Sequence, residues 1–259
     1  MEVMNDWATA TAEATSPAGA TMLRVSVWRG GADGKFQEFR VPRRESQTVL
    51  DIVTHIQRRI DPTLAYRFAC RVGMCGSCAM TVNGAPRWTC RTHVDEVAVA
   101  GRLQIGPLAN LPVVRDLVAD MREFFDKWAR ARGHFKPSAT RNDDFAKVSP
   151  QGRERIEADA GIECIGCGVC YAACDIVKWN RDYLGPAALN RAWTLANDVR
   201  DAGSVERLLA VSGDAGCHSC HTLGSCTELC PKKLSPTRSI AGLKRATLAV
   251  ALGRKERGE

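Results

Sequence analysis

Hydrophobic and polar residues alternate along the first part of the chain, at the two-residue period of half-buried strands. Residues 22–28 alternate in this way, and residues 36–41 alternate again after a glycine-rich turn, so we expect a hairpin. A second hairpin is predicted at Asn83-Gly84, because these residue types accept the positive φ of a tight turn. A last strand is expected at 102–105.

Between these strands the apolar period changes to that of a helix. Thr48 is expected to cap this helix, with Asp51 three residues later, and the apolar stripe behind it extends to Ile60. The same spacing recurs over residues 113–130 and predicts a long amphipathic helix. Strands, hairpins and helix together predict a small α+β domain.

Helical periods dominate the second half of the chain, and none of its segments alternates convincingly. Residues 130–147 are basic, aperiodic and interrupted by Gly and Pro, which predicts a connecting loop. Ser149-Pro150 predicts a capped helix start, with Pro at the first helical position. Further helices are expected at 186–199, at 202–211 and from Ser235-Pro236 to about residue 252.

The chain has 259 residues, 12 cysteines and a formal net charge of +7. Residues 1–20 carry acidic residues but no Lys or Arg, which predicts a loose tail and not a signal peptide. The longest apolar stretch near the end, 246–252, is too short to span a bilayer. Cysteines of a chain that is not exported stay reduced and serve as metal ligands or nucleophiles.

Positive charge is concentrated from Pro231 onward, where eight Lys or Arg stand against two Glu in 29 residues. One interpretation is a solvated basic end. The other is attraction to an anionic membrane surface or to a membrane-bound partner. Nucleic acid is not expected, because no aromatic residues interleave with these basic ones.

All 12 cysteines fall into three groups. The second group, at 164–174, has the spacing C-x2-C-x2-C-x3-C, in which three cysteines bind one iron–sulfur cluster and the fourth binds another. The third group repeats this spacing from Cys220, with Leu223 in place of the second cysteine. Three thiolates at the resulting second site favour a [3Fe–4S] cluster. The last cysteine of each run is therefore expected to bind the cluster of the other run. This predicts a [4Fe–4S] set of Cys164, Cys167, Cys170 and Cys230, and a [3Fe–4S] set of Cys174, Cys220 and Cys226.

Cys217 lies three residues before Cys220 and belongs to neither set. Counting alone leaves two interpretations open. It is either a fourth ligand, which would make the second cluster [4Fe–4S], or a thiol that binds no metal. We favour the second, because Cys217 lies outside the register of the repeat.

The first group has the spacing C-x4-C-x2-C-x11-C, which is typical of a plant-type [2Fe–2S] cluster. Gly73 and Gly76 lie within it and give the backbone the freedom to bring N–H groups to the sulfurs. Zinc also binds four thiolates, but zinc sites favour two separate C-x2-C pairs and only one occurs here. The predicted ligands are Cys70, Cys75, Cys78 and Cys90.

With these motifs identified, the chain resembles the iron–sulfur subunits of succinate dehydrogenase and fumarate reductase over about residues 22–250. R-F-A-C-R-V-G-M-C-G-S-C resembles the family's [2Fe–2S] loop, while C-I-G-C-G-V-C-Y-A-A-C and C-H-T-L-G-S-C-T-E-L-C-P-K resemble its second domain. The resemblance implies a β-grasp [2Fe–2S] ferredoxin domain followed by an all-α, bacterial-ferredoxin-like domain. It also implies electron passage between an FAD-containing flavoprotein subunit and a quinone beside membrane anchor subunits.

Trp179, His221 and Lys244 match positions that the family has on the quinone side. By residue type alone, a lone Trp is usually part of a core, and a Lys in a basic helix is usually solvated. Asp175 departs from the family, which commonly has Pro at this position. An ionised carboxylate there would lower the potential of a nearby cluster, and the alternative role is a proton relay near the quinone.

We therefore expect a tail at 1–20, a [2Fe–2S] domain with a connecting helix at 21–130, and a helical two-cluster domain at 131–259. The expected function is electron transfer in a succinate:quinone or quinol:fumarate oxidoreductase, peripheral on the cytoplasmic side of a bacterial inner membrane. Without a G-x-G-x-x-G flavin fingerprint, the dicarboxylate chemistry is expected in the partner. The alternatives are a free-standing soluble polyferredoxin and, more distantly, a structural zinc protein.

Overall fold

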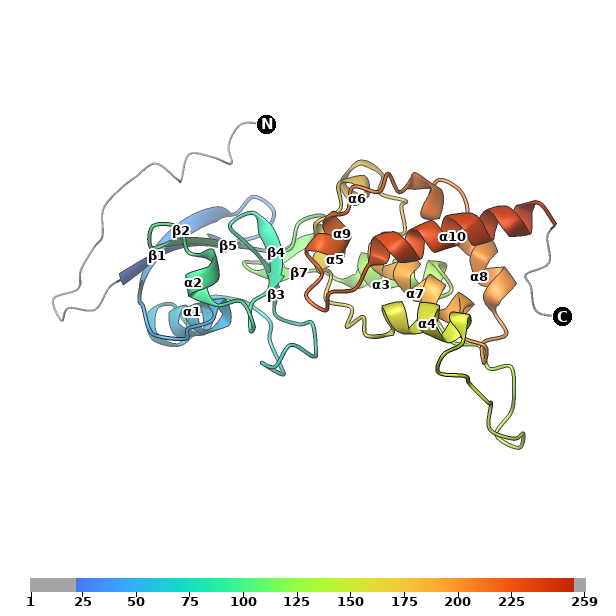
Figure 1. Cartoon of the computed structure of the whole chain (residues 1–259). Coiled ribbons are helices and arrows are strands. Elements are labelled where there is room, and N and C mark those ends of the chain that lie inside the picture. The colour runs from blue at the N-terminus through green and yellow to red at the C-terminus, as the bar shows by residue number, and fades with distance from the viewer. Residues whose placement is uncertain (1–21, 254–259) are drawn as a thin grey trace. The chain divides into compact units, whose positions relative to one another are not determined.

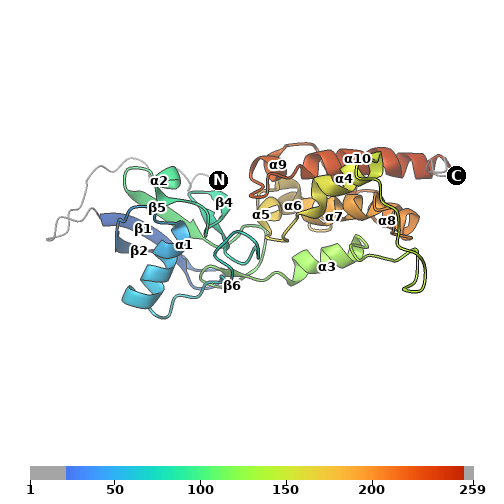
Figure 2. The same ribbon diagram turned by 60° about the horizontal axis from the view of Figure 1, so that its bottom comes forward.

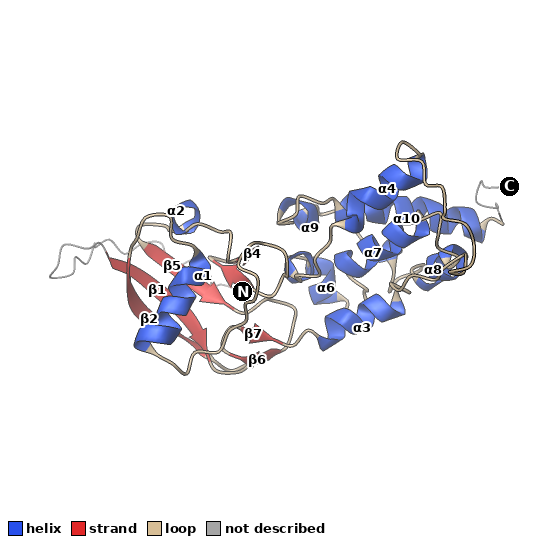
Figure 3. Ribbon diagram, turned by 90° about the horizontal axis from the view of Figure 1, so that it is seen from below, coloured by secondary structure: helices blue, strands red, loops and turns tan. Residues whose placement is uncertain are grey.

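The computed structural model describes residues 22–253, so the expected tail at 1–20 lies outside the described residues. The chain divides into two compact units, Met1–Asp120 and Met121–Glu259 (Figure 1). The first unit contains the strands, and the second is helical within its described residues (Figure 3). None of the helices within residues 22–253 is long and apolar enough to cross a membrane.

The first unit is built on a five-stranded mixed sheet with the order β2-β1-β5-β3-β4. Neighbouring strands are antiparallel except β1 and β5, which are parallel and lie in the centre. The two predicted hairpins are confirmed as β1–β2 and β3–β4, and Asn83 and Gly84 both adopt positive φ in the second turn. The strands are β1 (Met22–Arg29), β2 (Lys35–Pro42), β3 (Ala79–Val82), β4 (Ala85–Trp88) and β5 (Arg102–Gly106).

The predicted helix behind Thr48 is α1 (Val49–His55), and it continues as one turn of π-helix, η2 (Ile56–Ile60). Its capping box is formed as expected: Asp51 N donates to Thr48 Oγ1, and Thr48 N donates to Asp51 Oδ2 at 3.0 Å. The apolar stripe of α1 packs on the sheet and forms one buried cluster with the inward residues of β1 and β5. A short helix, α2 (Val94–Val97), precedes β5.

The predicted helix at 113–130 is wrong in its first part. Residues of that part form a small antiparallel pair, β6 (Val113–Arg115) and β7 (Val118–Ala119), and helix α3 begins only at Arg122 (Arg122–Arg130). The cause is Asp116, a buried residue with a φ of 51°. Its carboxylate accepts hydrogen bonds from Gly30 N at 2.7 Å and Ala65 N at 2.8 Å, and these tertiary bonds override the helical apolar spacing.

The helical unit is arranged around α7, which packs against α3, α4, α8 and α10 (Figure 2). The predicted helices at 186–199, 202–211 and 235–252 are confirmed with slightly shorter bounds, and Ser235 caps α10 as expected. The predicted start at Ser149-Pro150 is wrong, because α4 begins at Arg153 with Gly152 as its N-cap. The helices are α4 (Arg153–Ile162), α5 (Val169–Ala172), α6 (Asp175–Trp179), α7 (Pro186–Ala196), α8 (Ser204–Ala210), α9 (Ser225–Glu228) and α10 (Pro236–Ala251).

A buried polar network holds α4, α7 and α10 together. Asn190 donates to Gly161 O at 3.1 Å and accepts from Ser239 Oγ at 2.9 Å. A Cβ at Gly161 would lie 2.6 Å from Thr194 Oγ1, so the two helices approach at a distance that only glycine permits. The network fixes α7, which contributes Ala187 and Asn190 to the wall of a cysteine-lined hollow described below.

The boundary between the two units lies at Asp120, earlier than the predicted boundary at residue 130. Helix α3 belongs to the second unit, because Lys127 and Phe124 pack on Tyr171 of α5. The expected connecting loop after α3 has no helix or strand over 131–147 apart from an isolated bridge at Pro137. Arg207 holds the first residues of this loop in place, because it donates hydrogen bonds to the carbonyls of Arg132 and His134. The same side chain forms an ion pair with the buried Asp201.

Candidate metal centres

The first cysteine loop, between η2 and β3, brings backbone N–H groups to its sulfurs. Cys70 Sγ accepts from the backbone nitrogens of Val72, Met74 and Cys75 at 3.3–3.4 Å. Gly73 and Gly76 take positive φ, as predicted, and a Cβ at Gly73 would lie 2.7 Å from the Trp88 ring. Such N–H donors stabilise thiolate sulfur, and they are a recurrent feature around cluster-bound cysteines.

The four cysteines of this loop differ in exposure and in the pKa of their thiols. The hydrogen bond from Cys70 N, helped by Ser77, lowers the pKa of the exposed Cys75 thiol to about 6. Burial, followed by the neighbouring Cys78 sulfur, raises the pKa of Cys90 to about 12. Cys78 and Cys90 pack against Leu50, with Tyr66, Phe68 and Trp88 beside them. The structure thus places Cys70, Cys75 and Cys78 on one loop and packs Cys90, which follows β4, against Cys78 on its buried side.

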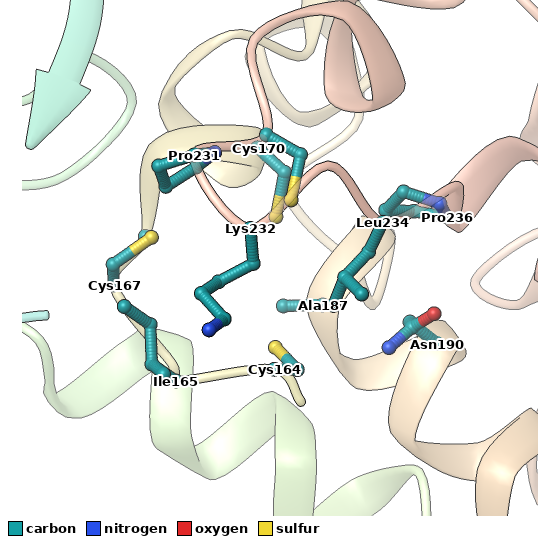
Figure 4. A pocket seen from close by; sticks show the side chains of 12 residues that line it. Cys164, Ile165, Cys167, Cys170, Ala187, Asn190, Pro231, Lys232, Leu234 and Pro236 are labelled. Atoms are coloured by element: carbon teal, nitrogen blue, oxygen red, sulfur yellow. The ribbon is translucent and has the colours of Figure 1, made fainter. Parts of the chain in front are cut away.

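In the helical unit, one set of cysteines surrounds a hollow of about 400 Å³, a volume that includes space open to solvent. Figure 4 shows the labelled Cys164, Cys167 and Cys170 side chains around it. Cys230 reaches the same hollow from a segment more than fifty residues later in the chain. Gly166 and Gly168 take positive φ and let this cysteine run turn tightly.

Burial determines the protonation of these sulfurs. It raises the pKa of Cys164, raises that of Cys167 to about 12 and raises that of the buried Cys170 well above its ordinary value. Neighbouring cysteine sulfurs add to each shift, since two thiolates repel. A bound iron–sulfur cluster would offset both effects, because positive iron stabilises the thiolate form of a cysteine ligand.

Cys174 leaves this set and lines a second hollow of about 340 Å³ with Cys220 and Cys226. It is the N-cap residue of α6, and burial raises the pKa of its thiol, an effect that the nearby backbone N–H groups of Val177 and Ile176 partly offset. Leu223, which is 55 % exposed, lies on the same wall, at the position where the repeat lacks a cysteine.

Cys217 lies outside both hollows. It is fully buried in the short 3-10 helix η3 (Cys217–Ser219), and its sulfur is 3.7 Å from Thr247 Oγ1 on α10. Burial raises the pKa of its thiol. The Cys217 side chain therefore packs against α10 and lines neither hollow.

The residues expected on the quinone side are spread around the second hollow. His221 lines it and is exposed, as is Asp175, the first residue of α6. Trp179 ends α6 with 70 % of its surface exposed and is not part of the wall. Lys244, on α10, donates to Cys220 O at 2.7 Å, so it contacts the backbone of the hollow and not its interior.

Sequence reasoning missed two residues of these sites. Lys232 lines the first hollow, and Tyr183, which is almost fully buried, lines the second. The available signal for Lys232 was its place two residues after Cys230. Tyr183 carried no signal, because its loop lies between α6 and α7 and outside every cysteine motif.

The residues present fit iron–sulfur clusters. Within the described part of the chain, no three His, Cys, Asp or Glu side chains converge closely enough to bind a single metal ion. The cysteines instead surround open space or wrap a loop with inward N–H donors, which suits a polynuclear group. A ferredoxin-type sheet with one such loop, joined to a helical unit with two cysteine-lined hollows, defines an iron–sulfur electron-transfer protein.

Comparisons with known proteins agree with this class. Residues 22–126 match the family model described as a 2Fe-2S iron-sulfur cluster binding domain, and residues 163–235 match the 4Fe-4S dicluster domain. The succinate dehydrogenase iron-sulfur subunit of Paracoccus denitrificans is 39% identical over 197 residues, covering 76% of this chain and 74% of the relative. The fumarate reductase iron-sulfur subunit of Mycobacterium tuberculosis is 34% identical, covering 84% and 87%.

Among solved structures, a chain of the Mycobacterium smegmatis Sdh1 complex in the apo form superposes with a TM-score of 0.79. It is 27% identical and covers 90% of this chain and 97% of that one. The protein belongs to the family of iron–sulfur subunits of succinate dehydrogenase and fumarate reductase, the electron-transfer subunits of these oxidoreductases. The free-standing polyferredoxin is not favoured by these relatives.

Proposed function

We propose that the chain relays electrons, one at a time, between an FAD-containing flavoprotein subunit and a quinone beside membrane anchor subunits. The family supports these partners, and the dicarboxylate chemistry then belongs to the flavoprotein. When bound, the clusters supply one-electron redox chemistry. The protein would lie peripherally on the cytoplasmic side of a bacterial inner membrane.

The ligand sets proposed for this relay follow the walls of the two hollows. Cys164, Cys167, Cys170 and Cys230 would hold a [4Fe–4S] cluster, and Cys174, Cys220 and Cys226 a [3Fe–4S] cluster. One observation carries the proposal: Cys174 follows Cys170 closely in sequence, yet Cys170 lines the first hollow and Cys174 lines the second. The first loop would hold a [2Fe–2S] cluster on Cys70, Cys75, Cys78 and Cys90.

EPR of the purified complex during a redox titration tests the ligand sets directly. We expect three signals, of which one is the [3Fe–4S] signal of the oxidised protein. Leu223→Cys should replace that signal by the signal of a [4Fe–4S] cluster, because the new thiolate at position 223 can bind a fourth iron in the second hollow. Leu223→Ala is the matched control, since it also removes the leucine but adds no ligand. An unchanged three-iron signal in Leu223→Cys would contradict the proposed set.

The quinone side is proposed at the second hollow. His221 lies on its wall, Trp179 ends the helix that begins at the wall residue Asp175, and Lys244 donates to the carbonyl of the wall residue Cys220, which supports the assignment. Asp175 is the charged residue of this wall whose effect is most easily measured. Asp175→Asn should raise the three-iron potential or lower quinone reductase activity. If neither changes, neither proposed role of Asp175 survives.

Membership of a complex is tested by gel filtration of a native membrane extract. Co-elution with a flavoprotein is the expected result, and elution as a lone small species would favour the soluble polyferredoxin. The basic residues after Pro231 favour attachment to an anionic surface, which added salt should weaken.

A further inference from the structure

Lys232 introduces a fixed positive charge into a cysteine-lined hollow whose other lining residues, apart from the cysteines, are uncharged. It is the one Lys, Arg, Asp or Glu among the described residues that line the space around Cys164, Cys167 and Cys170. Figure 4 shows its side chain extending across the hollow that these sulfurs surround. The rest of the wall, apart from the cysteines, consists of Ile165, Gly168, Ala187, Asn190, Pro231, Leu234 and Pro236.

The ammonium group of Lys232 is held by Glu163, with Nζ and Oε2 3.2 Å apart. Glu163 precedes the first cysteine of the proposed set, and Lys232 lies two residues after the last one, so the pair joins the two ends of the ligand set. The partners differ in solvation: the Lys232 side chain is 22 % exposed and that of Glu163 is 64 % exposed. Water therefore screens the carboxylate more than the ammonium.

The second hollow has the opposite character. Its described lining residues include Asp175 and His221 but no Lys or Arg. The nearby Lys244 directs its ammonium at Cys220 O and does not line the wall. The two hollows therefore differ in the sign of the fixed charge on their walls.

We propose that Lys232 sets the reduction potential of the cluster held by Cys164, Cys167, Cys170 and Cys230, and that Glu163 holds Lys232 in place. This inference rests on the ligand set proposed above. Each electron passed along the relay adds one negative charge inside this hollow. A cation on an apolar wall stabilises that charge more than it would in water, so Lys232 favours the reduced state.

The test is a redox titration, followed by EPR, of the intact complex carrying Lys232→Met. Methionine keeps most of the unbranched stem over the hollow and removes the charge. We expect the reduction equilibrium of the [4Fe–4S] cluster to move about tenfold towards the oxidised state, which is about 59 mV for one electron. The three-iron cluster should shift much less. Lys233→Met is the matched control, because Lys233 is the next residue, exposed and absent from the wall.

Glu163→Gln should shift the same potential upwards, because the amide oxygen of glutamine can still accept a hydrogen bond from Lys232 and hold it in place, while the carboxylate charge that partly neutralises Lys232 is removed. This second variant decides the matter if Lys232→Met assembles no [4Fe–4S] cluster. Equal shifts in Lys232→Met and Lys233→Met, or an unmoved potential in Glu163→Gln, would overturn the inference. The proposed ligand set has its own readout: a wild-type complex without a [4Fe–4S] signal refutes that set, whereas a signal that Lys232 does not influence refutes only this inference.

Discussion

The exposed part of the first cysteine loop and the helical unit prepare sulfur for metal in opposite ways. In the loop, N–H groups of Val72, Met74 and Cys75 point at Cys70, and the exposed Cys75 thiol has a pKa lowered to about 6. In the helical unit, burial raises the pKa of the thiols, to about 12 at Cys167. The exposed part of the loop thus stabilises thiolate before any metal arrives, whereas the helical thiols, like the buried Cys90 of the first group, would lose their protons only to a bound metal.

The largest effect is expected when one sulfur is removed from the buried cysteines of the first hollow, because this change should affect the helical unit and not the first unit. Cys170→Ser should abolish the cluster in the first hollow, because Cys170 is a buried member of the proposed ligand set and lines that hollow. The [2Fe–2S] signal should remain, since its loop belongs to the other unit. Iron content and EPR measure both. Equal loss of all three signals would show that the units do not assemble independently.

The difference in thiol pKa predicts different reactivity in the cluster-free chain. At pH 7 Cys75 is mainly thiolate and Cys167 is protonated, so iodoacetamide should alkylate Cys75 more than about a hundredfold faster. Because the pKa of Cys75 is lowered, its reaction should slow as the pH falls through about 6. Peptide mass spectrometry reports both rates. Equal rates at the two residues would remove the contrast between loop and hollow.

A smaller effect is expected from the packing that frames the helical hollows. Gly161→Ala should lower the free energy of unfolding of this unit by about 1–3 kcal/mol, since its Cβ would lie 2.6 Å from Thr194 Oγ1. Gly31→Ala in the first unit is the matched control, because nothing lies within 4 Å of the added atom. Calorimetry should find only the helical transition shifted. A shift in both transitions, or in neither, would contradict this account.

The smallest effect is expected at Cys217. Cys217→Ser should leave all three cluster signals unchanged, because its sulfur contacts Thr247 and neither hollow. The EPR spectrum of Cys217→Ser should be compared with that of Cys226→Ser, which should lose the three-iron signal. Loss or conversion of the second helical-unit cluster in Cys217→Ser would make Cys217 a ligand.

Cysteine spacing predicted more of this protein than hydrophobic period did. The repeat from Cys220 was sufficient to predict which cysteines share a wall, because the fixed spacing within each run shows which cysteine is exchanged with the other run. The helix expected from residue 113 failed, since the bonds of Asp116 to Gly30 and Ala65 come from distant segments. The ion pair of Lys232 with Glu163 has the same origin, because it spans almost seventy residues and no local pattern encodes it.

The distance in sequence between Cys170 and Cys230 has a consequence for the order of events during synthesis. A ribosome delivers the chain from its N-terminus, so the first loop is complete while most of the helical unit is still unmade. The wall of the first hollow closes only when Cys230 emerges, directly before α10. Cofactor insertion into this unit must therefore follow translation of nearly the whole chain, whereas the N-terminal loop can be loaded earlier.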